Sequence, residues 1–117
     1  MTNALTHRAS IRPLAPWPER AFAAMSDGHV VAVGAWHRLP GGLSAELSLV
    51  LHDATAETLA VGLLRDMAVD AARSGVRRFV HESGSDDAPV RRVIRAAGFE
   101  SATVYQQGVM RSSFAIA

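Results

Sequence analysis

The sequence predicts an α/β fold in which one mixed sheet packs against helices. Two observations support this prediction. Apolar residues alternate with a period of two in some segments and recur with a helical period in others. These segments follow one another as strands, helix, strand, helix and strands. A strand that follows a helical crossover runs parallel to the strand before it, so we expect a mostly antiparallel sheet with a parallel central pair.

Three strands are predicted between Arg20 and the first helix. Arg20–Met25 alternates weakly and ends at a turn signal, whereas His29–Arg38 and Leu43–His52 alternate clearly. The segment Leu39-Pro40-Gly41-Gly42 between the two clear strands predicts a hairpin. With the glycines at the centre of the turn, His37 lies opposite Glu46. One face of the second strand then carries Leu47, Leu49 and Leu51, and the other carries Glu46, Ser48, Val50 and His52.

Two helices and three further strands follow. The apolar stripe of Thr55–Arg73 predicts a helix that ends at Gly75, and Val76–Glu82 then alternates as a strand. Asp87, Pro89 and Gly98 mark the bounds of the second helix, and Asp87 is expected to cap its start. The closing strands are predicted at Glu100–Tyr105 and Val109–Ile116, joined around Gln107-Gly108.

The segment before Arg20 has little periodicity. We expect residues 1–19 to form an N-terminal segment, with a short edge strand at Ile11–Leu14 and a proline-containing linker at Ala15–Glu19. Residues 20–117 are expected to form one domain, because 117 residues suffice for a single core.

Composition excludes several kinds of site. The chain has no cysteine and all 12 of its basic residues are arginine, so it has no thiol nucleophile, disulfide or lysine for catalysis. The net charge of +1 predicts no nucleic-acid partner, and no apolar run has the length of a membrane span. We expect a protein of the bacterial cytoplasm.

Three segments, in this order, resemble the GNAT superfamily of acyl-CoA-dependent N-acyltransferases. Ala45–Leu51 is similar to the central strand of that family, Ser74–Val80 to its helix-to-strand step, and Asp87–Phe99 to its last helix, which ends in Gly-Phe. The resemblance runs from Arg20 to the C-terminus and is closest to bacterial protein-lysine acetyltransferases. It implies a GNAT-type sheet with flanking helices.

The resemblance also implies a site. Glu46 stands where the family often has its general base, and the backbone of Leu49, Val50 and Leu51 would hold the pantetheine arm of acetyl-CoA. Amides at Thr58, Leu59 and Ala60 would receive the phosphates. Asp87 occupies the position of an asparagine beside the cofactor.

The chain departs from the family in four ways. The pyrophosphate turn has lost its glycines, since Thr58 replaces one of them, and Glu57 places a negative charge where the phosphates dock. Ile94 stands in place of the tyrosine that protonates the leaving thiolate in many members. The usual first two helices are missing, because only the linker at Ala15–Glu19 separates the first two candidate strands.

Two functions therefore remain open. One is an N-acetyltransferase that transfers an acyl group from acetyl-CoA to an amine. The other is a degenerate GNAT-fold module for binding, regulation or dimerisation. In both cases we expect a homodimer or a partner protein to cover the exposed sheet.

Other candidate residues have simpler structural interpretations. His37, His52 and His81 lack the spacing of metal ligands, so no metal is expected, and the pair of His37 with Glu46 is expected to be a structural contact. The arginines of the last helix, Arg91, Arg92 and Arg95, are expected to form a solvated face.

Overall fold

The computed structural model describes residues 19–52, 56–83 and 87–117. The predicted edge strand at 11–14 and nearly all of the linker that follows it lie outside these residues. Neither of the two described helices is both long and apolar enough to cross a membrane.

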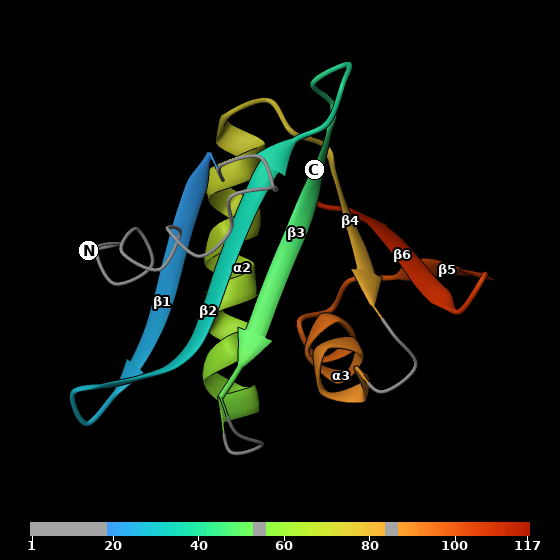
Figure 1. Cartoon of the computed structure of the whole chain (residues 1–117). Coiled ribbons are helices and arrows are strands. Elements are labelled where there is room, and N and C mark those ends of the chain that lie inside the picture. The colour runs from blue at the N-terminus through green and yellow to red at the C-terminus, as the bar shows by residue number, and fades with distance from the viewer. Residues whose placement is uncertain (1–18, 53–55, 84–86) are drawn as a thin grey trace, which may run out of the picture.

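The sheet has the predicted mixed topology. Its six described strands stand in the order β1-β2-β3-β4-β6-β5, and only β3 and β4 run parallel to each other (Figure 1). The strand bounds are β1 Arg20–Ser26, β2 His29–Arg38, β3 Ser44–Leu51, β4 Arg78–Ser83, β5 Ser101–Gln106 and β6 Val109–Ala115. The predicted strands are thus confirmed to within two residues at each end.

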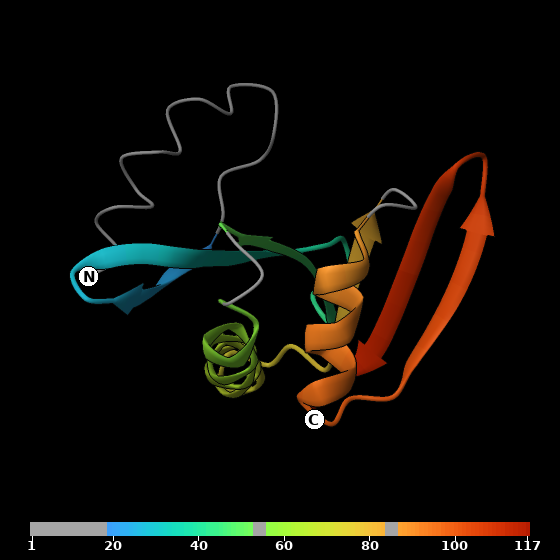
Figure 2. The ribbon, with the colours of Figure 1, turned by 90° about the horizontal axis from the view of Figure 1, so that it is seen from below.

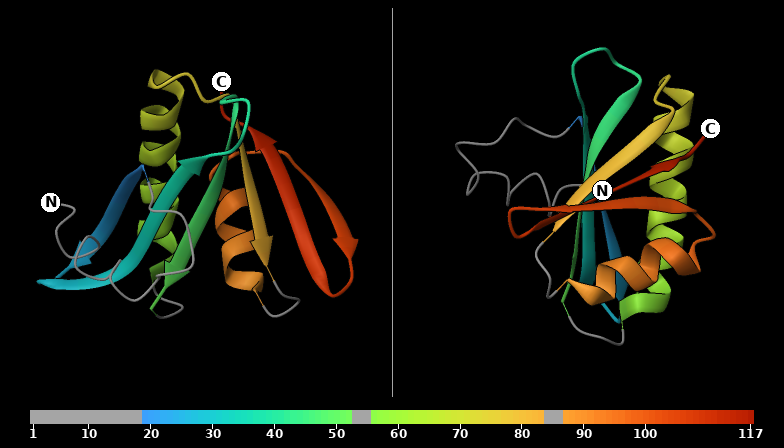
Figure 3. Two further views of the ribbon diagram at one scale, coloured as in Figure 1. Left: turned by 45° about the horizontal axis from the view of Figure 1, so that its top comes forward. Right: turned by 90° about the vertical axis from the view of Figure 1, so that its right-hand side faces the viewer.

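Both described helices pack on one face of this sheet. They are α2 at Glu57–Arg73 and α3 at Ala88–Ala96, and Figures 2 and 3 show them on the same side of the strands. The opposite face carries no described helix. Gly75 and Gly98 follow the two helices with φ values of 92° and 93°, a left-handed conformation that favours glycine, and so end them as predicted.

The core lies between the helices and the sheet. Trp36, Phe79 and Phe114 are its largest fully buried side chains. Phe114 of β6 contacts Phe79 edge-on at 6.0 Å and Phe99 at 5.0 Å between ring centroids. These aromatic contacts join β4, β6 and the end of α3, so the C-terminal hairpin shares the core of the central sheet.

The predicted hairpin register is confirmed. His37 of β2 lies opposite Glu46 of β3. Leu47 and Leu49 are buried on the face that carries the helices. Ser48 and Val50 on the other face are exposed, and Glu46 on that face is partly exposed.

Candidate functional site

The central parallel strands separate soon after they meet. β3 and β4 pair only over Ser44–Glu46 and Arg78–Val80. β3 then continues to Leu51 and β4 to Ser83, and Figure 1 shows the two strands diverging towards their carboxyl ends. We call the region between Leu47–Leu51 and His81–Ser83 the strand opening.

Backbone groups of β3 face this opening. Ser44 accepts a hydrogen bond from Leu39 on the β2 side, whereas Leu43 accepts hydrogen bonds from Arg77 and Arg78 on the β4 side. Because successive residues of a strand direct their backbone groups to opposite sides, the groups of Leu47, Leu49 and Leu51 are directed towards β4. Leu47 still meets β4 at the end of the paired region, whereas Leu49 and Leu51 pair with no described residue of β4.

Val50 has a different place in β3. It pairs with Val33 of β2, and its side chain is 50% exposed on the face without helices. Of the three residues to which the resemblance assigns a backbone role, only Leu49 and Leu51 therefore direct backbone groups towards the opening.

His81 bridges the narrow end of the opening. Its Nδ1 atom lies 3.2 Å from the backbone oxygen of Leu47, and its Nε2 atom lies 3.3 Å from Oδ2 of Asp87. The imidazole is buried, with 6% of its side chain exposed. One side chain thus links β3, β4 and the residue that precedes α3.

The expected capping role of Asp87 is wrong. Asp87 does stand at the N-cap position of α3, but its side chain makes no capping hydrogen bond to the helix. Its carboxylate contacts His81 instead. The imidazole of His81 therefore takes the place of a helix amide as the partner of this carboxylate.

The N-termini of both helices lie at the open end of the strands. Figure 1 shows α2 and α3 beginning beside the carboxyl ends of β3 and β4. The first amides of a helix have no partner within the helix and carry partial positive charge. Thr58 and Leu59 of the first turn of α2 are exposed, whereas the Ala60 side chain is fully buried in the core.

An ion pair joins the first turn of α2 to the middle of α3. Arg92 of α3 donates from Nε to one oxygen of Glu57 at 3.1 Å and from Nη2 to the other at 2.7 Å. The hydrogen bond from Arg92 lowers the pKa of the Glu57 carboxyl. Because the folded-state pKa is lowered, the ion pair is present at neutral pH and is lost as the pH falls through that lowered pKa. The arginine thus offsets the charge that Glu57 brings to the first turn.

Glu46 lies at the narrow end of the opening, where β3 and β4 part. It is the last residue of β3 that pairs with β4, opposite Val80, and its side chain is on the face without helices. Its Oε1 atom is 3.3 Å from Nε2 of His37, and 42% of the Glu46 side chain is exposed. The carboxylate is therefore next to the point of divergence and open to solvent.

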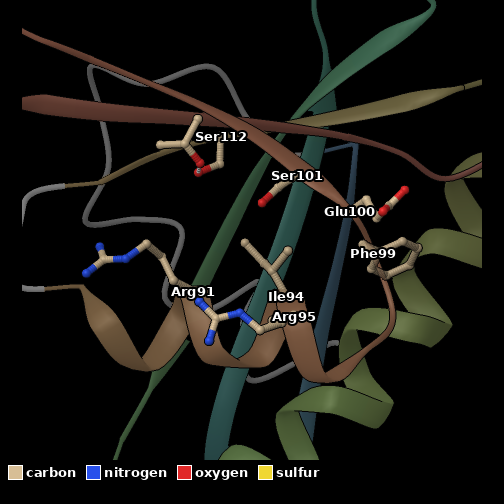
Figure 4. Close-up of a pocket in the computed structure, with 8 residues that line it drawn as sticks. Arg91, Ile94, Arg95, Phe99, Glu100, Ser101 and Ser112 are labelled. Atoms are coloured by element: carbon tan, nitrogen blue, oxygen red, sulfur yellow. Dashed lines mark hydrogen bonds between the residues drawn. The ribbon is translucent and has the colours of Figure 1, made fainter.

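Arg92 and Arg95 of α3 are exposed, as expected of a solvated face, whereas Arg91 is half-buried. These side chains also meet other parts of the molecule. Arg92 pairs with Glu57, while Arg91 and Arg95 line a cavity of about 450 Å³ between α3 and the β5–β6 hairpin. Figure 4 shows both side chains on α3 beneath Ser101 and Ser112 of the hairpin. Sequence periodicity could not reveal these partners, because Glu57 is 35 residues from Arg92 and the position of the hairpin over α3 depends on tertiary packing.

No site for a metal ion is visible in the described part of the chain. Within residues 19–52, 56–83 and 87–117, histidine, aspartate and glutamate side chains nowhere gather in a group of three or more. Ile94 is buried and offers no proton donor.

Comparison with known proteins shows similarity only at the level of structure. Neither a protein-family model nor a curated protein sequence matches the chain. The GNAT domain of S. lividans PAT has 26% identity and a TM-score of 0.69 over 81% of this chain and 59% of its own. The chain thus spans less than two thirds of the length of that protein.

Two further solved structures support the same fold. One is yncA from Salmonella typhimurium, a proposed acetyltransferase with its cofactor acetyl-CoA, with 18% identity and a TM-score of 0.70 over 99% of this chain and 88% of its own. The other is an IAA acetyltransferase from Bacillus cereus, with 13% identity and a TM-score of 0.63 over 81% and 76%. The topology and these likenesses show that the chain has the fold of the GNAT superfamily.

Proposed function

We propose that the protein is an acetyl-CoA-dependent N-acetyltransferase. The observation that carries this proposal is the strand opening, where a parallel pair diverges and the described residues of β4 leave the outward backbone groups of Leu49 and Leu51 unpaired. An extended chain with amide groups can pair there as another strand would. The pantetheine arm of acetyl-CoA has this chemistry.

The first turn of α2 lies where the phosphate end of acetyl-CoA would bind. Amides of Thr58, Leu59 and Ala60 at the start of α2 would face the phosphates, and the side chain of Ala60 also packs in the core. Arg92 supplies a cation beside that turn, although Glu57 already neutralises it. Asp87 contacts His81 and contributes a carboxylate, which cannot donate a hydrogen bond to a phosphate.

Glu46 is the proposed general base. When bound, acetyl-CoA supplies the acyl thioester, and the amine must lose a proton to attack it. The exposed carboxylate of Glu46 can accept that proton directly or through one water molecule. His37, at 3.3 Å, holds this carboxylate in place from the neighbouring strand.

Replacing Glu57 by glutamine is expected to strengthen CoA binding. The change removes a negative charge from the first turn of α2 and frees Arg92 for the phosphates. We expect the dissociation constant for CoA to fall by about tenfold, because like charges near a protein surface cost on the order of 1–4 kcal/mol. Calorimetric titration at low salt measures this change.

The matched control is Arg92→Gln, which removes the cation and leaves Glu57 uncompensated. It should weaken CoA binding relative to the unmodified chain. Equal affinities for all three proteins would show that the phosphates do not approach this turn.

A specific observation favours a second function. The ion pair of Glu57 with Arg92 closes the first turn of α2 with internal contacts, and the turn carries no glycine where a phosphate needs close approach. A GNAT-fold module that binds a partner without chemistry would need no phosphate site. This alternative predicts no turnover with any amine.

Turnover with a panel of amines separates the two functions. The assay measures release of free CoA from acetyl-CoA in the presence of small amines and lysine-containing peptides. The chain has no lysine, so self-acetylation is confined to its α-amino group and the background is low. Amine-dependent release supports the acetyltransferase, and release equal to the background with every amine supports the binding module.

The cellular setting and assembly are also part of the proposal. We infer a bacterial cytoplasmic protein that works as a homodimer or with a partner protein. The face without described helices supports an assembly, because the apolar side chain of Val50 is 50% exposed there.

A further inference from the structure

β5 is an edge strand that no described residue pairs with on its outer side. It is the last strand in the order, and all six of its residues are exposed. Its sequence, Ser-Ala-Thr-Val-Tyr-Gln, has no charge and no proline, and its pairing with β6 has no bulge. The other described edge, β1, begins with Arg20 and has a register shift at Ala24 and Met25. Sheet edges usually carry such features because they prevent pairing with another chain.

The turn of the hairpin shows which groups of β5 face outward. Gln107 and Gly108 form a two-residue turn with φ values of 54° and 79°, and such a turn closes with a bond between the residues that flank it, Gln106 and Val109. The backbone of Gln106 therefore faces β6. By alternation, the N–H and C=O groups of Ser101, Thr103 and Tyr105 face away from the sheet.

These outward groups are complementary to a second copy of themselves. We propose that β5 pairs antiparallel with β5 of a second copy of this chain, with the two-fold axis at Thr103. This register places Thr103 opposite Thr103 of the second copy, and Ser101 opposite its Tyr105. Each outward N–H then meets an outward carbonyl, and the sheet becomes continuous through both copies.

The side chains fit the same register. Val104 and Tyr105 are 59% and 63% exposed, although both are large and apolar in part. Val104 would pack against Ala102 of the second copy on one face. Glu100 would lie opposite Gln106 of the second copy, so no like charges meet.

Tyr105 of the second copy would also find a packing position on the face that carries the helices. The partners in an antiparallel pair project on the same face, with Cβ atoms about 4.5–5.5 Å apart. Tyr105 of the second copy would therefore lie beside Ser101, at the rim of the 450 Å³ cavity that Arg95 and Phe99 also line (Figure 4). A tyrosine ring there covers apolar surface and can stack on the guanidinium of Arg95.

This register concerns the assembly and does not depend on acetyl-CoA, so it can fail while the proposed activity holds. Sedimentation of the full chain tests it through Thr103→Pro. Proline removes an N–H that faces outward, and proline is tolerated at an edge strand for that reason. We expect the unmodified chain to sediment as a dimer and the variant to dissociate at least tenfold more easily, with an unchanged circular dichroism spectrum.

Thr103→Val is the matched control. It removes the hydroxyl that contacts Ser112 at 3.1 Å but keeps the backbone N–H, so the dimer should persist. A monomeric unmodified chain, or equal dissociation of the proline variant and the unmodified chain, would overturn the proposal.

Cysteine cross-linking tests the register itself and remains informative if the proline variant does not fold. The chain has no cysteine, so Thr103→Cys introduces a single thiol. Opposite residues in this pairing have Cα atoms about 5.5 Å apart, which suits a disulfide. Oxidation should yield a covalent dimer. Gln106→Cys should yield no covalent dimer, because this register places Gln106 of one copy far from Gln106 of the second copy. Equal yields from the two variants would contradict the register.

Discussion

Replacing Glu46 by glutamine is expected to lower kcat/KM for amine acetylation by about 10²–10⁴-fold, the usual contribution of a positioned general base. Glutamine keeps the shape and the contact with His37 but does not accept the proton of the amine. Binding of acetyl-CoA should not change, because the Glu46 side chain is on the face without helices and the amides proposed to receive the phosphates are on α2. The rate of CoA release and the affinity for acetyl-CoA, measured on the same samples, check both expectations.

Ser48→Ala serves as the matched control. Ser48 is the next side chain of β3 on the same face, and it is exposed. This variant should keep the activity of the unmodified protein. If Glu46→Gln also retains more than half of that activity, another group takes the proton and the assignment of Glu46 is wrong.

Replacing Phe114 by alanine is expected to lower the free energy of unfolding by about 3–5 kcal/mol. Phe114 is fully buried and contacts both Phe79 and Phe99. Its removal leaves a cavity where β4, β6 and the end of α3 meet. Urea unfolding followed by circular dichroism, at one fixed protein concentration, measures the loss.

Ser113→Ala is the comparison variant for this measurement. Ser113 is the preceding residue of β6 and lies on the opposite face of the sheet, where its only described side-chain contact is with Arg78 at 3.5 Å. Its replacement should change the free energy of unfolding by no more than about 0.5 kcal/mol. Equal effects of the two substitutions would show that the hairpin does not share the central core.

The order of the elements and the hairpin register could be predicted from the sequence because both depend on local patterns. The alternation in β3 placed Leu47 and Leu49 towards the core, and the glycine turn placed His37 opposite Glu46. These signals need only neighbouring residues and turn chemistry. They were sufficient for the topology that the comparisons with solved structures support.

The contacts of the site could not be predicted in the same way. Glu57 and Arg92 are 35 residues apart, and their pairing depends on how α2 and α3 pack. Asp87 satisfied the rule for a helix cap, yet the burial of His81 beside it gave its carboxylate a different partner. Local rules describe what a side chain can do, whereas tertiary packing decides which partner it finds.

The divergence of β3 from β4 could not be predicted from the alternation of apolar residues either. The sequence of β3 remains regular up to Leu51, although pairing with β4 ends at Glu46. His81 accounts for part of this difference, because its side chain occupies the position next to Leu47 and bonds to the Leu47 carbonyl. The resemblance to GNAT proteins assigned a proposed role to Leu49–Leu51, but the geometry of this region became visible only in the structure.

Calorimetric titration of the purified chain with acetyl-CoA and with CoA tests the central claim most directly. The proposed function predicts a dissociation constant in the micromolar range, about 8 kcal/mol of binding free energy, and a matching rise in Tm. No heat and no rise in Tm at millimolar concentrations of either ligand would contradict the acetyltransferase proposal and leave the binding module as the function of this fold.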